Sequence, residues 1–156
     1  MSHSIVIASD HAAIELKAAL VAWLEEQGHD VTDLGPHNHQ SVDYPDFGYA
    51  LAEAIAAGDE QFGVALCGSG IGISIAVNRN PACRCALVSD NLAARLSREH
   101  NDANVIAMGA RLIGIETAKD CLAAFLSTEF GGDRQQRRVD KLSNPTPSSA
   151  VSKEVA

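Results

Sequence analysis

Short apolar runs alternate along this chain with longer segments in which apolar residues recur every three or four positions. A short continuous apolar run is typical of a parallel strand that is buried on both faces. The pattern predicts strands at residues 4–8, 30–34, 62–66, 85–89 and 104–108. A five-stranded parallel sheet is therefore expected.

The segments between these runs have the 3.6-residue repeat of amphipathic helices. The first helix is expected over residues 11–27, with Leu20 and Leu24 on its apolar side and Gly28 as its stop. Other helices are expected from Pro45 onward and over residues 71–77, 92–99 (with Asp90 or Asn91 as N-cap) and 115–126. Repeated strand–helix units predict an α/β fold with a doubly wound parallel sheet.

Length and composition indicate one domain. The chain has 156 residues, of which 46% are hydrophobic and 21% are charged, and two domains would each be too small to bury a core. The stretch from Ser143 to Ser149 is rich in proline and serine. We therefore expect a single domain over residues 1–143 and a disordered tail over residues 144–156.

Charge and cysteine usage narrow the function classes. The net charge of −8 argues against nucleic acid or an anionic membrane as the main partner, and no apolar run approaches the ~20 residues of a membrane span. The four cysteines match neither a redox C-x-x-C pair nor a zinc spacing, and no signal-peptide pattern opens the chain. A cytoplasmic protein with reduced thiols is expected. His37 and His39 alone are too few for a metal site.

The most informative segment is Cys67-Gly68-Ser69-Gly70-Ile71-Gly72, between the third strand and the helix that follows it. Its alternating glycines let several backbone N–H groups point at one site, which can hold a phosphate or an enolate oxygen. The dinucleotide fingerprint belongs after the first strand, where this chain has Ser9-Asp10-His11, and no P-loop occurs. A cysteine-dependent phosphatase would need an arginine in the loop. Phosphoryl transfer is therefore not expected. A structural turn with an inert, packed cysteine is the alternative, but the cysteine and the glycines together favour a base beside an anion cradle.

Other polar residues follow neighbouring strands. Ligands of doubly wound sheets bind outside the carboxyl ends of the strands, where the strand order reverses. Asp10, His11, Asp90 and Arg111 follow strands one, four and five, so we expect them near Cys67. Taken singly, His11 could open a helix and Arg111 could form a surface ion pair, but their joint arrangement favours a site.

Two further pairs of residues lie outside that group. His100 and Asn101 are expected in the connection just before the fifth strand, and Asn101 could simply cap a turn. Arg134 and Arg138 are four residues apart, on one face if the segment is helical, where two guanidinium groups suit a phosphate dianion. A solvated basic helix is the alternative.

Five segments occur in the order seen in one family. They are Asp10-His11, Asp43-Tyr44-Pro45, the 67–72 loop, residues 95–104 and residues 134–142. From about Ile5 to Ser143 the chain resembles type B ribose-5-phosphate isomerases, enzymes of the pentose phosphate pathway, and their relatives acting on galactose 6-phosphate. The resemblance implies a Rossmann-like three-layer sandwich with a C-terminal helix, no metal or cofactor, and a homodimer with active sites at the subunit boundary. Whether two dimers associate further stays open.

The resemblance also implies roles for individual residues. Cys67 matches the catalytic base, His100 matches the residue that assists opening of the sugar ring, and Ser69 lies in the loop that holds the enediolate oxygen. The positions that match substrate contacts are Asp10, His11, Gly68, Ser69, Gly70, Ile71, Gly72, Asn101, Arg111, Arg134 and Arg138. In the family the C-terminal arginines reach the partner subunit's site.

Three departures from the family pattern concern the sugar and its phosphate. Ser69 stands where threonine is usual, Gln135 stands where histidine is common, and Asp133 adds a negative charge beside Arg134. The expected reaction interconverts D-ribose 5-phosphate and D-ribulose 5-phosphate through an enediolate. The alternatives are an isomerase of a hexose 6-phosphate (allose or galactose) or of a tetrose phosphate, and a non-catalytic sugar-phosphate-binding module.

Overall fold

A computed structural model describes residues 1–146, and within them the alternation of strands and helices is confirmed. The strands are β1 (Ser4–Ser9), β2 (Asp30–Asp33), β3 (Phe62–Cys67), β4 (Cys85–Leu87) and β5 (Val105–Gly109). They form one all-parallel sheet in the order β2-β1-β3-β5-β4. The expected five-stranded parallel sheet is therefore correct.

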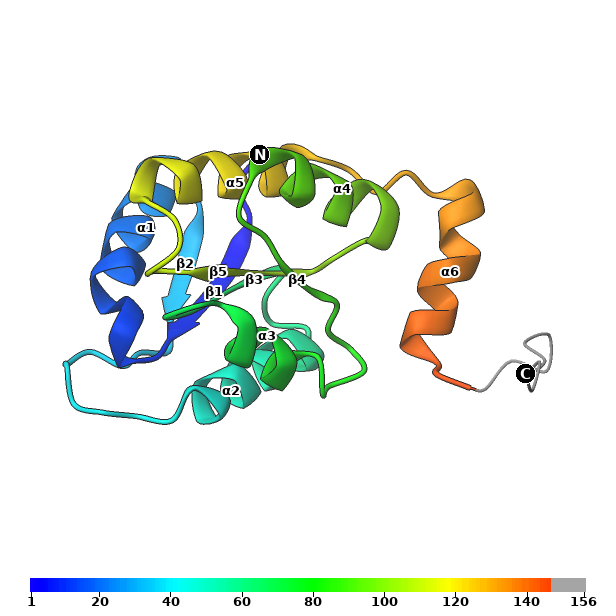
Figure 1. Cartoon of the computed structure of the whole chain (residues 1–156). Helices are drawn as coiled ribbons and strands as arrows, with labels where there is room; N and C mark the ends of the chain where they lie inside the picture. The colour runs from blue at the N-terminus through cyan, green and yellow to red at the C-terminus, as the bar shows by residue number, and fades with distance from the viewer. Residues whose placement is uncertain (147–156) are drawn as a thin grey trace, which may run out of the picture.

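Helices cover both faces of the sheet, as the doubly wound prediction requires. They are α1 (Ile14–Glu26), α2 (Tyr44–Ala57), α3 (Ile71–Val77), α4 (Asn91–Asn101), α5 (Ile115–Ser127) and α6 (Asp133–Ser143). Figure 1 shows α1, α4 and α5 on one face and α2 and α3 on the other, while α6 stands beside the sheet. The result is a Rossmann-like three-layer sandwich with a C-terminal helix.

Each face of the sheet has its own hydrophobic core. Ile5, Ile7 and Leu66 point toward the layer of α1, α4 and α5, where Phe125 is fully buried. Alternate residues of the same strands, such as Val6, point toward the layer of α2 and α3. Because side chains alternate along a strand, continuous apolar runs fill both cores.

Some element boundaries differ from the predicted ones. The segment after β1 begins with a 3-10 turn, His11–Ala13, before α1 starts at Ile14, because the Asp10 carboxylate accepts a hydrogen bond from the Ala12 N–H and caps this turn. Strand β4 ends at Leu87 instead of residue 89. Asp90, not Asn91, is the N-cap of α4.

The C-terminal arginine segment is helical, as α6. Beyond it, both the N–H and the side-chain amide of Asn144 donate to the Asp140 carbonyl oxygen, which continues the helix end by one residue. Residues 147–156 of the predicted tail lie outside the described part of the chain.

The strand order reverses between β1 and β3. The chain moves from β1 outward to β2 on one side, and continues from β3 to β5 and β4 on the other. Helices approaching from opposite faces leave a crevice at the carboxyl ends of these two strands. Asp10 and Cys67 lie at this point.

Candidate active site

Cys67 is the last residue of β3 and lies opposite Gly109, the last residue of β5. Its side chain is buried, with 4% of the residue exposed. The N–H of Gly70 donates to its Sγ at 3.1 Å, and the N–H of Ile71 donates to the Ser69 hydroxyl at 3.2 Å. The loop therefore folds back over the sulfur.

Two glycines make this loop conformation possible. Gly70 has φ +76, in the left-handed region, and a Cβ there would lie 2.8 Å from the Met108 carbonyl carbon. A Cβ on Gly109 would lie 2.5 Å from the Ser69 carbonyl carbon. Such contacts exclude any side chain, so the close approach of the loop to β5 depends on glycine on both sides.

Backbone N–H groups of this loop are available for a ligand. Within residues 1–146, the N–H groups of Gly68 and Ser69 donate to no protein acceptor. They come directly after Cys67, and the first turn of α3 follows them. An anionic oxygen beside the sulfur could accept their hydrogen bonds.

Arg111 lies beside the same loop, as the strand ends predicted. Its N–H donates to the Gly68 carbonyl oxygen at 2.9 Å, and the N–H of Ala110 donates to that of Cys67 at 2.9 Å. The guanidinium Nη1 is 3.4 Å from the place a Cβ on Gly68 would occupy. The segment after β5 therefore brings a cation next to the loop.

Asp10 and His11 also lie at this edge. The N–H of Asp10 donates to the Leu66 carbonyl oxygen, which joins the end of β1 to the residue before Cys67. The N–H of Val42 donates to Nδ1 of His11 at 3.2 Å. Because Nδ1 is an acceptor, a neutral His11 ring carries its proton on Nε2 and presents a donor there.

His100 and Asn101, in contrast, lie at the opposite edge of the sheet. They belong to the last turn of α4 and not to a connection, and β5 starts only a few residues later. Strand β5 runs from Val105 to Gly109, so its two ends are roughly 13 Å apart at 3.3 Å per residue. One chain therefore does not bring His100 to Cys67.

The arginines of α6 lie on the side of the molecule that carries the end of α4. The N–H of Gly131, just before α6, donates to the Glu99 carbonyl oxygen. Arg138 Nη1 donates to Oε1 of Gln135 at 2.7 Å, and Gln135 is buried. The glutamine that replaces the usual histidine thus holds one of the two arginines.

A cavity of about 570 Å³ lies between the end of α4 and the end of α6. It is lined among others by Asn101 and Leu142 but by no residue of the 67–72 loop.

The other three cysteines lie outside the 67–72 loop. Cys83 is buried in the core on the α2 and α3 side, and Cys85 packs against that core, so both serve packing. Burial raises the pKa of Cys83 to about 11, and burial also raises the pKa of Cys85 and of Cys121. All three therefore stay protonated near neutral pH.

No metal cluster is formed by the residues that the structure describes: within positions 1–146, three His, Cys, Asp or Glu side chains nowhere converge on a common point. His37 and His39 instead lie near single carboxylates, those of Asp33 and Glu15. Over the same residues no helix has the length and apolarity to cross a membrane.

Sequence reasoning missed three residues that shape these two edges. The ring of Tyr44 lies against Gly72, and a Cβ on Gly72 would be only 2.6 Å from Tyr44 Cζ. Arg84 and Asp102 bind the end of α4. Tyr44 and Asp102 belong to segments that carried the family resemblance, which was a signal, whereas nothing in the local sequence marked Arg84.

Comparisons with known proteins match most of the chain to one family. The sequence model of the Ribose/Galactose Isomerase family matches residues 5–142. Ribose-5-phosphate isomerase B of Escherichia coli is 40% identical over 88% of this chain and 93% of its own. D-erythrulose-4-phosphate isomerase of Pectobacterium atrosepticum is 42% identical over 89% of this chain and 92% of its own. A crystal structure of a Thermotoga maritima ribose 5-phosphate isomerase superimposes with a TM-score of 0.89 at 44% identity, covering 90% of this chain and 97% of the other.

Proposed function

Because the chain belongs to the ribose/galactose isomerase family and is therefore a sugar-phosphate isomerase, we propose that it interconverts D-ribose 5-phosphate and D-ribulose 5-phosphate. The observation that carries the proposal is the loop in which the N–H of Gly70 donates to Cys67 Sγ, next to two backbone N–H groups that have no acceptor among residues 1–146. A base beside an oxyanion cradle is what an aldose–ketose isomerisation needs.

The first step opens the sugar ring, and His100 assists it. One proton leaves the anomeric hydroxyl while another is delivered to the ring oxygen O4, and the bond between C1 and O4 breaks. The products are a C1 aldehyde and a C4 hydroxyl. An imidazole suits this exchange because it can donate and accept protons near neutral pH.

The second step moves a hydrogen between adjacent carbons. The Cys67 thiolate takes the proton from C2, the electron pair forms the C1–C2 double bond, and negative charge develops on O1. The N–H groups of Gly68 and Ser69 hold that oxygen. Return of the proton to C1, with transfer of the O2 proton to O1, gives the ketose. Each lost oxyanion donor typically costs ~3 to 4 kcal/mol of transition-state stabilisation.

The complete site requires two copies of the chain. Cys67 and Arg111 lie at the carboxyl edge of the sheet, whereas His100 and the arginines of α6 lie on another side. In a two-fold symmetric dimer, each carboxyl edge can receive the α4 end and α6 of its partner. Arg134 and Arg138 would then bind the phosphate of a sugar held at the partner's Cys67 loop.

An apolar surface beside the loop supports such a dimer. Ile71 and Ile75 are one turn apart on α3 and about half exposed, and Leu87 lies over Gly70, the residue before Ile71. Clustered apolar side chains of this kind are typical of a protein interface.

A second substrate has a specific observation in its favour. The chain is 42% identical to a D-erythrulose-4-phosphate isomerase, so a tetrose phosphate is the alternative to the pentose. The same cysteine and cradle would serve both sugars, since the chemistry at C1 and C2 is the same. Free thiols at all four cysteines suit a cytoplasmic location for either reaction.

The test supplies purified protein with D-ribose 5-phosphate, D-erythrose 4-phosphate, D-allose 6-phosphate and D-galactose 6-phosphate in parallel, and follows ketose formation. We expect the pentose to have the highest kcat/KM and Cys67→Ala to lose turnover while still binding the substrate. Higher kcat/KM for another sugar would change the substrate assignment. Turnover by the variant near the wild-type rate would contradict Cys67 as the base, and binding without turnover by the wild type would favour the binding module.

A further inference from the structure

The C-terminal end of α4, which carries His100, is held by a side chain from outside the helix. The last carbonyl groups of a helix have no partner within the helix and need donors from elsewhere. Here Nε of Arg84, just before β4, donates to the carbonyl oxygens of Asn101 at 3.1 Å and Asp102 at 2.9 Å. A guanidinium at this end also complements the negative end of the helix dipole.

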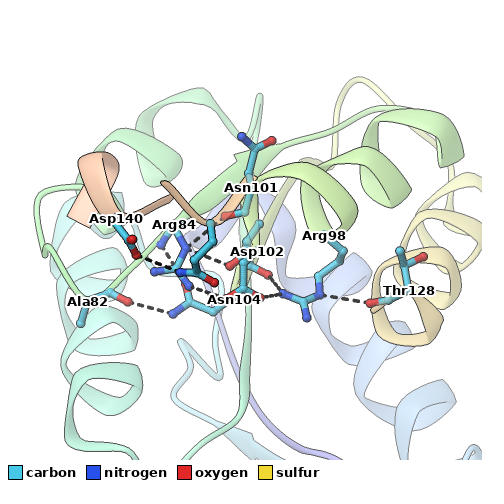
Figure 2. A network of polar contacts seen from close by, with 10 residues as sticks. Ala82, Arg84, Arg98, Asn101, Asp102, Asn104, Thr128 and Asp140 are labelled. Atoms are coloured by element: carbon cyan, nitrogen blue, oxygen red, sulfur yellow. Dashed lines mark hydrogen bonds and ion pairs between the residues drawn. The ribbon is translucent and has the colours of Figure 1, made fainter. Parts of the chain in front are cut away.

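Asp102 joins this guanidinium to a second one. It adopts the left-handed conformation, with φ 46, as the C-cap of α4. Its Oδ2 accepts from Arg84 Nη2 at 3.1 Å and its Oδ1 accepts from Arg98 Nη1 at 2.8 Å. Figure 2 shows the carboxylate between the two arginines, which come from the two sides of the helix end.

Arg98 fixes the other side of the network to the core. It is 8% exposed, and its guanidinium lies 5.0 Å from the ring centroid of Phe62. Its Nη1 also donates to the Ala103 carbonyl oxygen and its Nε to that of Thr128, after α5. The turn that contains His100 is therefore bound to the residue before β4, to the segment that leads into β5 and to the C-cap of α5.

His100 itself has no such anchor. In the part of the chain that the structure describes, its ring makes no hydrogen bond and no ion pair. Its position relative to the partner's loop therefore follows from where the last turn of α4 is held. A shift of about 1 Å in a catalytic group can cost up to about 100-fold in rate, so the support of this turn has a direct consequence for ring opening.

We propose that Arg84 and Asp102 are positioning residues for His100, holding the last turn of α4 so that the imidazole reaches the ring oxygen of a sugar bound at the partner subunit. This inference rests on the proposed role of His100 in ring opening. Arg84 and Asp102 thus contribute to ring opening and not to proton removal by Cys67.

The two steps can be measured separately with one sugar pair. Conversion of D-ribose 5-phosphate requires ring opening. D-ribulose 5-phosphate cannot close a furanose ring because its O5 carries the phosphate, so exchange of its C1 hydrogen with D₂O, followed by NMR, reports proton removal without any ring step. His100→Ala should lose conversion and keep exchange, and Cys67→Ala should lose both.

For Arg84→Ala and Asp102→Ala we expect kcat for D-ribose 5-phosphate to fall by about 10-fold or more, with C1 exchange changed by less than about twofold. Asp102→Asn tolerates the left-handed backbone but keeps only one of the two accepting oxygens, so its conversion rate should lie between those of Asp102→Ala and the wild type. The matched control is Arg95→Ala, which removes an exposed ion pair with Glu99 on the same helix and should change neither rate.

The measurements distinguish a failure of the proposed role of His100 from a failure of the inference about Arg84 and Asp102. If His100→Ala loses both rates equally, the proposed role of His100 is wrong and the inference falls with it. Suppose that His100→Ala loses conversion but keeps C1 exchange. If the Arg84 and Asp102 variants then lose both rates equally, their role is structural, and if they lose neither rate, they have no role. Either result overturns only the inference. Should an alanine variant fail to fold by circular dichroism, Arg84→Lys and Asp102→Asn decide: selective loss in Arg84→Lys supports the inference, and two unchanged rates in both overturn it.

Discussion

The N–H of Gly70 donates a hydrogen bond to Sγ of Cys67 at 3.1 Å. The bond closes a turn of the chain directly after β3, and it exists because Gly70 adopts a left-handed conformation with φ +76. A thiolate accepts such a bond better than a thiol does, since charged acceptors form the stronger hydrogen bonds. The geometry of one glycine thus determines the surroundings of the proposed base.

Replacing this glycine should therefore impair catalysis more than folding. In Gly70→Ala the left-handed backbone costs about 1 to 2 kcal/mol, and the new Cβ would lie 2.8 Å from the Met108 carbonyl carbon, so the loop must move away from Cys67. We expect a lower Tm and a fall in kcat of about 10-fold or more. Thermal unfolding and steady-state kinetics measure the two effects.

Gly58→Ala is the matched control for that variant. Gly58 also has a left-handed backbone, φ +81, but a Cβ there would have no neighbour within 4 Å among the described residues, and it ends α2 away from the loop. It should lower the Tm and leave kcat unchanged. An equal loss of kcat in both variants would mean that general destabilisation, and not the loop geometry, limits the rate.

The division of the site between two edges predicts complementation. Cys67→Ala and His100→Ala should each be inactive on D-ribose 5-phosphate as homodimers. In a mixture refolded together, about half of the dimers combine both variants, and each of these has one intact site of two, so about a quarter of the wild-type activity should return. Turnover of the mixture, followed against the mixing ratio, measures this.

The same mixture also tests the dimer itself. Mixing the two folded homodimers without unfolding should restore activity only as subunits exchange. If the refolded mixture stays inactive although size-exclusion chromatography shows dimers, Cys67 and His100 do not share a site across the subunit boundary.

Much of the fold could be predicted from the sequence, because parallel strands and amphipathic helices have patterns that burial imposes locally. The run from Phe62 to Leu66 and the glycines after Cys67 predicted both a strand and the loop at its end, and β3 and the turn to α3 confirm them. The predicted strand extends beyond the end of β4 because Val88, the residue after it, is apolar and buried. Hydrophobicity alone does not distinguish a buried residue just after a strand from one within it.

The site was harder to predict, since part of it is not local. His100 and Asn101 were placed in a connection although they end α4, and the sequence does not tell at which edge of the sheet a helix ends until the strand order is known. Arg84 was overlooked because its partners, Asn101 and Asp102, are 17 and 18 residues away. The roles of the site residues stay predictions.

Arg134 offers a test of phosphate binding. Arg134→Ala should raise KM for D-ribose 5-phosphate about 10-fold or more with a smaller change in kcat, because a charge-assisted hydrogen bond contributes about 1.5 to 3 kcal/mol and the phosphate is remote from C1 and C2. Competition by inorganic phosphate should weaken in parallel. Arg137→Ala removes the same charge from the same helix and is the control, and equal KM values for both variants would argue against a specific phosphate role for Arg134.

A pair of histidines far from the loop bears on stability. The rings of His3 and His29 stack with centroids 5.3 Å apart. The backbone N–H of His3 also donates to Nδ1 of the His29 ring at 3.1 Å. Burial lowers the pKa of His29 from 6.5, and the nearby His3 and the chain's amino terminus lower it further. Protonation of His29 would also remove the acceptor of the hydrogen bond from His3.

The stability of the protein should consequently fall in mild acid through His29. With the pKa of His29 lower in the folded state, the unfolded chain binds more protons as the pH drops through 6.5, so the free energy of unfolding rises with pH in this window. Between pH 7.5 and pH 5.5 the Tm of His29→Gln should therefore fall less than that of the wild type, as differential scanning fluorimetry can measure. His39→Gln, at an exposed loop histidine, should follow the wild type, and a His29→Gln curve that does the same would show that His29 does not contribute to the acid sensitivity.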